Sequence, residues 1–141
     1  MLHINIICIG KLKEQYLKDA LNEYSKRLYK YCSLKIIELP DEKVPENLNA
    51  NIINKIKEIE SNNILSHIKN NSYTIALDLH GKQLSSEEFS LKIENIALNN
   101  NSNINFIIGG TLGLSDKLLK QATELISFSK MTFPHQLIRV F

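Results

Sequence analysis

The sequence contains no apolar run long enough to cross a membrane. Its longest apolar stretches, such as INIICIG at 4–10, are far shorter than the roughly 18 to 20 residues that a membrane-spanning helix needs. The N-terminus also lacks a basic region followed by a long apolar segment and a small-residue cleavage site, which is the pattern of a secretory signal. We therefore expect a protein without a transmembrane helix, located in the cytoplasm.

Cysteine is scarce and the charge is nearly balanced. The two cysteines, Cys8 and Cys32, lie in apolar surroundings without the spacing of a zinc site or a redox pair, so we expect buried, reduced thiols. No cluster of histidines and carboxylates indicates a metal, and we predict none. The net charge of +2 neither demands nor excludes an RNA partner, because attraction of nucleic acid usually depends on a concentrated basic patch.

The residues that are present have the balance of a soluble globular protein. A length of 141 residues, with 43% hydrophobic and 23% charged residues, predicts a single domain over 1–141. Apolar segments predict five strands, at 1–10, 34–39, 73–79, 104–108 and 124–129. Helical patterns follow them, at 11–31, at about 50–69, from Ser85 to about 98, from near Ser115, and from Pro134 as a first helical residue. This alternation predicts an α/β fold, with a mostly parallel sheet covered by helices on both faces. The spacing predicts that Tyr16 and Tyr24 lie on the apolar face of the first helix, that the glutamates of the second lie on its solvated face, and that Ser85 and Glu88 form a capping box.

Three loops at the carboxyl ends of the predicted strands form the expected ligand site, because open parallel sheets bind ligands at that edge. They are LDLHGK at 77–82, GGTLGLS at 109–115 and SFSKMTFP at 127–134. The glycines of the second loop permit positive φ and let a ligand approach the main chain, although a tight turn between strand and helix also explains them. Neither common phosphate-binding glycine pattern is present, so the spacing leaves the ligand open.

Five collinear segments carry a resemblance to one family. They are GKLKE at 10–14, PDEK with PEN within 40–47, LDLHGKQLSSEEF at 77–89, FIIGGTLGL at 106–114, and SFSKMTFPHQLIRV at 127–140. On these motifs the chain resembles the ribosomal RNA large subunit methyltransferase H family of the SPOUT superfamily. The resemblance implies a trefoil-knotted α/β fold, a homodimer, and an enzyme that uses S-adenosylmethionine to methylate N3 of a pseudouridine in 23S rRNA on the assembled ribosome.

The resemblance also implies where the cofactor binds. The residues that would contact S-adenosylmethionine are Leu77, Gly109, Phe128, Ser129, Lys130, Met131, Thr132 and Phe133. Among them, the apolar side chains of Leu77 and Phe133 would pack against the adenine. His135 and Arg139 are candidate RNA contacts, with a helix end, a solvated helix face or, for Arg139, a partner carboxylate as the alternatives. The sequence assigns no catalytic residue.

The end of the sequence departs from the family pattern. In the family, the helix that FPHQLIRV opens continues for several turns and ends in a tail with a Tyr-His pair, whereas this sequence ends at Phe141. A terminus on apolar residues without a polar or glycine cap predicts a truncated chain whose knot and dimer contact are incomplete. Two other hypotheses therefore stay open. One is an inactive remnant that binds the cofactor or the ribosome, and the other is a flavodoxin-like domain that binds another nucleotide at the same loops.

Overall fold

A parallel sheet organises the chain. The computed structural model describes residues 1–99 and 102–141, and within them five strands pair in the order β2-β1-β4-β3-β5, each pair parallel. The strands are β1 (Leu2–Ile9), β2 (Cys32–Leu39), β3 (Tyr73–Gln83), β4 (Asn103–Ile108) and β5 (Glu124–Ser127). The predicted α/β class is confirmed, with every predicted strand present.

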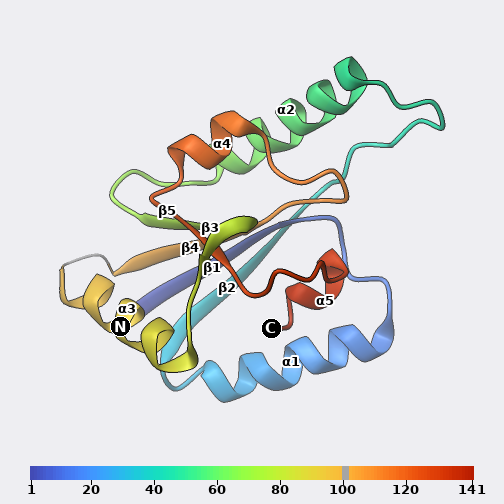
Figure 1. The fold of residues 1–141 in the computed structure, drawn as a ribbon. Coiled ribbons are helices and arrows are strands. Elements are labelled where there is room, and N and C mark those ends of the chain that lie inside the picture. Colours follow the sequence, from blue (N-terminus) through green and yellow to red (C-terminus); the bar gives the residue numbers. More distant parts are fainter. Residues whose placement is uncertain (100–101) are drawn as a thin grey trace.

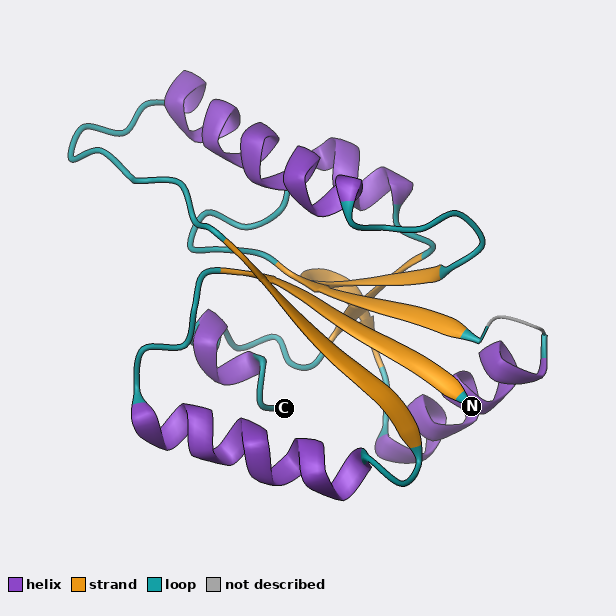
Figure 2. Ribbon diagram, turned by 180° about the vertical axis from the view of Figure 1, so that it is seen from behind, coloured by secondary structure: helices purple, strands orange, loops and turns teal. Residues whose placement is uncertain are grey.

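Helices cover both faces of the sheet, as predicted. They are α1 (Gln15–Leu28), α2 (Ala50–Ser66), α3 (Ser86–Leu98), α4 (Asp116–Gln121) and α5 (His135–Ile138). Helices α2 and α4 lie on one face, while α1, α3 and α5 lie on the other (Figures 1 and 2). The inner strands contain consecutive buried residues, as at 7–9 of β1, whereas exposed residues recur along the edge strand β2.

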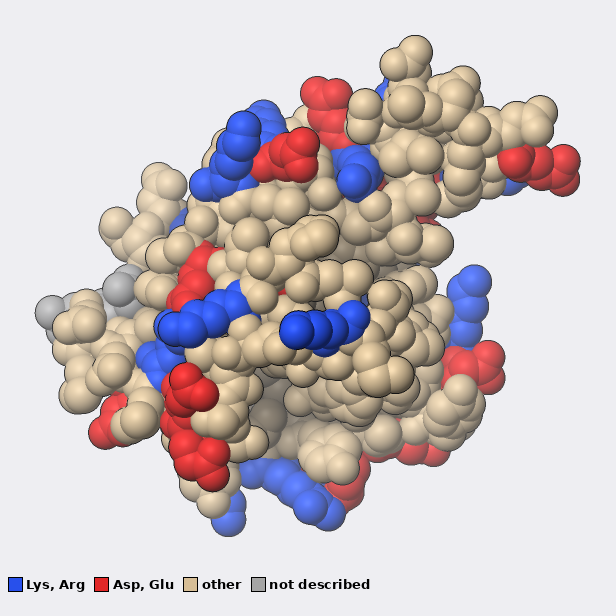
Figure 3. Space-filling view, in the orientation of Figure 1, with Lys and Arg blue, Asp and Glu red and all other residues tan. Residues whose placement is uncertain are grey.

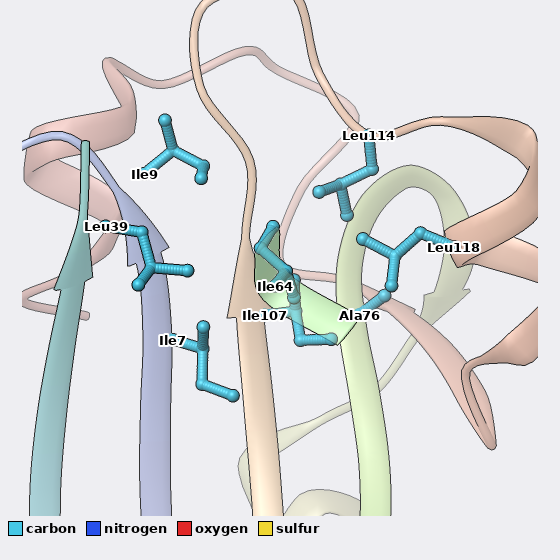
Figure 4. Packing of buried hydrophobic residues seen from close by; sticks show 8 residues of the cluster. All are labelled: Ile7, Ile9, Leu39, Ile64, Ala76, Ile107, Leu114 and Leu118. Atoms are coloured by element: carbon cyan, nitrogen blue, oxygen red, sulfur yellow. The ribbon is translucent and has the colours of Figure 1, made fainter. Parts of the chain in front are cut away.

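Two apolar clusters form the core, one on each side of the sheet. Under α2 and α4, the fully buried Ile64 and Leu118 pack on Ile7, Ala76 and Ile107 of three neighbouring strands (Figure 4). The opposite cluster joins Ile96 of α3 to residues of β3, β4 and β5. Each fully buried Ile or Leu side chain contributes about 1.5 to 3 kcal/mol through burial, so these clusters hold the helices against the sheet.

Helix α1 differs most from its predicted form. Residues 11–14 precede the helix, which begins at Gln15 and ends at Leu28. Tyr16 and Tyr24, predicted to lie on its buried apolar face, are 68% and 50% exposed, and Leu17 is the buried residue of the helix. The helix therefore packs along a narrower stripe than its sequence pattern predicts, and part of its aromatic surface faces solvent.

The strand and helix ends around the loops also differ from the predictions. Strand β3 continues to Gln83, four residues beyond its predicted end, whereas β5 stops at Ser127. Pro134 is the N-cap of α5 and not its first helical residue. Among the described residues, none of the helices is both long enough and apolar enough to cross a membrane.

Candidate active site

The loops after β3, β4 and β5 meet around one cavity at the carboxyl edge of the sheet. Its volume is about 490 Å³, within the range of small-molecule sites. Three segments line it, 77–80, 108–114 and 126–135 without Lys130, together with Ile138 of α5. The site that the strand order predicts is therefore a single concave surface built from distant parts of the chain.

The structure brings most of the predicted cofactor residues together. Those that line the cavity are Leu77, Gly109, Phe128, Ser129, Met131, Thr132 and Phe133. Lys130, also predicted as a cofactor contact, is exposed and is not part of the lining. His135 lines the cavity, whereas Arg139 does not.

The double glycine after β4 is required for close packing. A Cβ on Gly109 would lie 3.1 Å from the carbonyl carbon of Gly113, and one on Gly110 would lie 3.1 Å from the Ile9 side chain. The turn closes through a 3.0 Å hydrogen bond from the Gly113 N–H to the Gly110 carbonyl. Of these three glycines, Gly113 alone uses the positive φ that glycine permits, with a value of +84°. The small size of Gly109 and Gly110 is needed because two chain segments approach them.

Two buried polar residues of α2 support the neighbouring loops, Ser61 at the end of the glycine loop and Glu60 at the loop after β2. The Ser61 hydroxyl accepts a 3.1 Å hydrogen bond from the Ser115 N–H, and Glu60 accepts one of 3.0 Å from the Glu42 N–H. Burial raises the pKa of the Glu60 carboxyl, and the Glu42 N–H opposes this shift. Sequence reasoning did not single out Ser61, and it missed Glu60 because it assigned the glutamates of this helix to its solvated face. The signal was present, since Glu60 lies four residues from both Ile56 and Ile64 on the apolar stripe.

An irregularity in β3 forms the first wall of the cavity. Both Leu77 and Lys82 pair with Ile126 of β5, so the residues between them bulge out of the regular ladder. Within this bulge, the Asp78 carboxylate accepts a 3.0 Å hydrogen bond from the His80 N–H, and both residues line the cavity. The sequence predicts a turn here and does not indicate that β3 pairs with β5 again beyond it.

Local hydrogen bonds shape the wall that follows β5. The Ser127 hydroxyl donates to the Ser129 carbonyl at 2.8 Å, and the Ser129 hydroxyl accepts from the Met131 N–H at 3.0 Å. The ring of Phe133 meets that of Phe141 edge-on, with centroids 5.4 Å apart. These contacts fold 127–133 into a compact loop along the cavity.

The structure separates the two candidate RNA contacts. His135 is partly buried, and desolvation, followed by the nearby positive charge of Arg139, lowers its pKa below the usual value, so the imidazole is neutral at pH 7. The Arg139 side chain has no exposed surface and forms a 2.7 Å ion pair with Glu38. It therefore presents no surface to an RNA phosphate. Its partner is a carboxylate of the same chain, that of Glu38.

The described part of the chain contains no cluster of metal-ligating side chains. In 1–99 and 102–141, no three His, Cys, Asp or Glu side chains are grouped so that they could hold a metal ion. Cys8 and Cys32 are both buried and unpaired with each other. The chemical groups that surround the cavity are thus backbone amides and carbonyls, hydroxyls, one carboxylate, two imidazoles and apolar side chains.

Comparisons with known proteins show which family the chain is similar to. The chain is 60% identical over 139 residues to ribosomal RNA large subunit methyltransferase H of Clostridium botulinum (strain 657 / Type Ba4), covering 99% of this chain and 87% of that protein. It is 58% identical, with the same coverage, to the protein of that name from Clostridium acetobutylicum. The sequence profile of the family described as "Predicted SPOUT methyltransferase" matches residues 2–141. The chain belongs to the SPOUT methyltransferase family.

Proposed function

We propose that this chain transfers a methyl group from S-adenosylmethionine to N3 of a pseudouridine in 23S rRNA on the assembled ribosome. The observation that carries the proposal is the convergence of the three loops on one cavity. The names of the relatives, which are ribosomal RNA methyltransferases, support the class of substrate.

The cavity suits a nucleoside cofactor in size and in lining. We assign Leu77 and Phe133 to the adenine, and the backbone at Gly109 to its polar groups, because apolar side chains and a glycine line the cavity there. When bound, S-adenosylmethionine supplies a methyl group made electrophilic by the adjacent sulfonium. Lys130 is left out of this assignment because it lies outside the lining.

The residues of the chain contribute to the reaction mainly by positioning. Methylation at N3 needs loss of the N3 proton and an in-line arrangement of nitrogen, methyl carbon and sulfur, and orientation of reactants contributes several kcal/mol to such steps. His135 lines the cavity, and its lowered pKa keeps the imidazole neutral. We propose that this side chain contacts the RNA there. We assign no catalytic residue.

We propose a homodimer that acts in the cytoplasm, where the ribosomal substrate is found. The exposed large side chains of α1, which include Tyr16, Tyr24 and Leu28, support a protein contact on that helix. On the face shown in Figure 3, basic and acidic side chains are intermixed, so RNA binding would depend on particular contacts more than on a uniform basic surface. The trefoil knot stays a prediction.

Calorimetry with S-adenosylmethionine tests the proposal first, with ATP as the control ligand. We expect saturable binding of S-adenosylmethionine and none of ATP. Preferential binding of ATP would favour a flavodoxin-like nucleotide site. Absence of any binding by folded protein would favour an inactive relative.

A methylation assay follows. The protein, S-adenosylmethionine carrying a labelled methyl group, and ribosomes from a strain without this modification should yield label in 23S rRNA, located by mass spectrometry at one pseudouridine. Binding of the cofactor without transfer to ribosomes would refute the proposed reaction while leaving the cofactor site intact.

A further inference from the structure

The buried guanidinium of Arg139 joins the last helix to the opposite end of the chain. One of its nitrogens, Nη1, lies 2.7 Å from Glu38 Oε2 at the end of β2. The other, Nη2, donates to the carbonyls of Gly10 at 2.9 Å and Ile9 at 3.4 Å, where β1 ends. A single side chain therefore connects α5 with the carboxyl ends of two strands.

The Glu38 carboxylate belongs to the same network. The oxygen that pairs with Arg139, Oε2, also accepts a 3.0 Å hydrogen bond from the Leu12 N–H. The chain turns sharply after β1, where Gly10 has a φ of +88°. The Gly10 N–H donates a 2.7 Å hydrogen bond to the Leu39 carbonyl at the end of β2. Arg139 therefore contacts the ends of β1 and β2 where hydrogen bonds also join these two ends to each other. We call Arg139, Glu38 and the carbonyls of Ile9 and Gly10 the Arg139 latch.

Helix α5 depends on such contacts for its position. It has four residues, far fewer than a helix needs to be stable alone. Two of these residues, His135 and Ile138, line the cavity, and the helix directly follows the cofactor loop at 128–133. A second polar contact of this segment is a long 3.5 Å hydrogen bond that the Lys13 N–H donates to the Gln136 side chain. The contacts of Arg139 are shorter, charge-assisted and shielded from water.

We propose that Arg139 is a positioning residue of the cofactor site, and that the Arg139 latch holds α5 and the loop before it as one wall of the cavity. The expected effect on cofactor binding rests on the proposed function. The restraint on the loop does not, because it is a property of the chain without any ligand. A buried ion pair is seldom a strong source of stability, because desolvation offsets its attraction. Arg139 Nε is moreover buried without a partner. These costs favour a role in geometry over one in stability.

Arginine suits this position better than lysine. Its planar fork meets a carboxylate and two carbonyls in fixed directions at once, whereas an ammonium acts as a single point charge. Arg139→Lys should therefore restore only part of the effect. Glu38→Gln keeps an acceptor oxygen but removes the charge from the partner, and should weaken the latch to a smaller extent than Arg139→Met.

Hydrogen exchange tests the restraint without any cofactor. We expect Arg139→Met to speed exchange of amides in 128–138 by about tenfold or more, since hydrogen bonds to charged groups contribute on that scale. The matched control is Arg27→Met, which removes an arginine from the exposed 3.1 Å pair with Glu23 on α1. Unchanged exchange in 128–138 for Arg139→Met would overturn the latch. If that variant does not fold, Arg139→Lys and Glu38→Gln are compared in its place, with smaller increases expected.

Calorimetry with S-adenosylmethionine tests the consequence. Arg139→Met should raise the Kd about 10- to 100-fold, Arg139→Lys should lie between it and the wild type, and Arg27→Met should match the wild type. The effects of Arg139→Met and Glu38→Gln should not add, because both open the same network. Absence of binding by the wild type would refute the proposed function alone, since exchange still reports on the latch. Wild-type affinity in Arg139→Met would refute the positioning role.

Discussion

The replacement Gly81→Ala tests how closely β3 and β5 approach beside the cavity. A Cβ on Gly81 would lie 2.6 Å from the Ile126 nitrogen and 2.7 Å from the carbonyl carbons of Leu125 and Ile126. All three are backbone atoms of β5, so no change of side-chain rotamer relieves the overlap. Ile126 is itself 1% exposed and is part of the core, so β5 cannot shift without disturbing that packing.

The expected magnitude follows from these distances. Non-bonded heavy atoms normally lie about 3.5 to 4.0 Å apart, and overpacking in a core costs about 1 to 3 kcal/mol. We expect Gly81→Ala to reach the upper end, about 3 kcal/mol, because the colliding atoms belong to a buried strand. For a chain of this size that loss corresponds to a Tm lower by about 10 °C.

Thermal and urea denaturation measure the effect, with Gly110→Ala as a comparison. A Cβ on Gly110 would first meet the Ile9 side chain at 3.1 Å, and a side chain gives way more readily than backbone, so we expect a loss of about 1 kcal/mol. A Tm for Gly81→Ala within about 2 °C of the wild type would refute the close approach of β3 and β5.

Three other predictions follow from buried or capping groups. Burial raises the Glu60 pKa in the folded state above its unfolded value of about 4.5. Protonation of Glu60 therefore stabilises the folded state fully below that pH, and this contribution is lost as the pH rises through the folded pKa. Glu60→Gln, which does not titrate, should therefore gain stability relative to the wild type between about pH 4 and pH 7, and an unchanged difference in urea unfolding would contradict this sign. Burial raises the Cys8 pKa to about 11, so iodoacetamide should label this thiol far more slowly in native than in unfolded protein at pH 7, as mass spectrometry can measure. Ser85→Ala removes the cap that accepts the Glu88 N–H at 3.1 Å, and should cost about 1 kcal/mol in thermal unfolding while the affinity for S-adenosylmethionine stays at the wild-type value.

The convergence of the three loops on one cavity was predicted from local pattern and strand order. The carboxyl ends of parallel strands share one edge, so the loops that follow them must converge once the strands are correctly identified. The capping box at Ser85 is confirmed for the same reason, because its two hydrogen bonds join residues three apart. The choice of particular cofactor residues came from the family resemblance, and the structure brings all of them except Lys130 to the cavity.

Predictions were weaker where a residue has more than one possible partner. The pattern of α1 assigned Tyr16 and Tyr24 to its buried face, but the width of the buried stripe depends on how the helix lies on the sheet. Glu60 has the same spacing as its isoleucine neighbours, yet it is buried because the Glu42 N–H lies opposite its carboxylate. The exposure of the two tyrosines does not follow from helical period, and the burial of a carboxylate at the Glu60 position depends on a partner that the loop after β2 supplies.

Local pattern was enough to predict the α/β class, the segments that form strands, and the edge of the sheet where the cavity lies, because periodicity and turn chemistry act over a few residues. The tertiary structure alone decided that β3 pairs again with β5 beyond its bulge, and that Arg139 is buried against Glu38. Those two side chains are 101 residues apart in the chain. A contact over such a separation depends on the packing of whole elements, which no local pattern encodes.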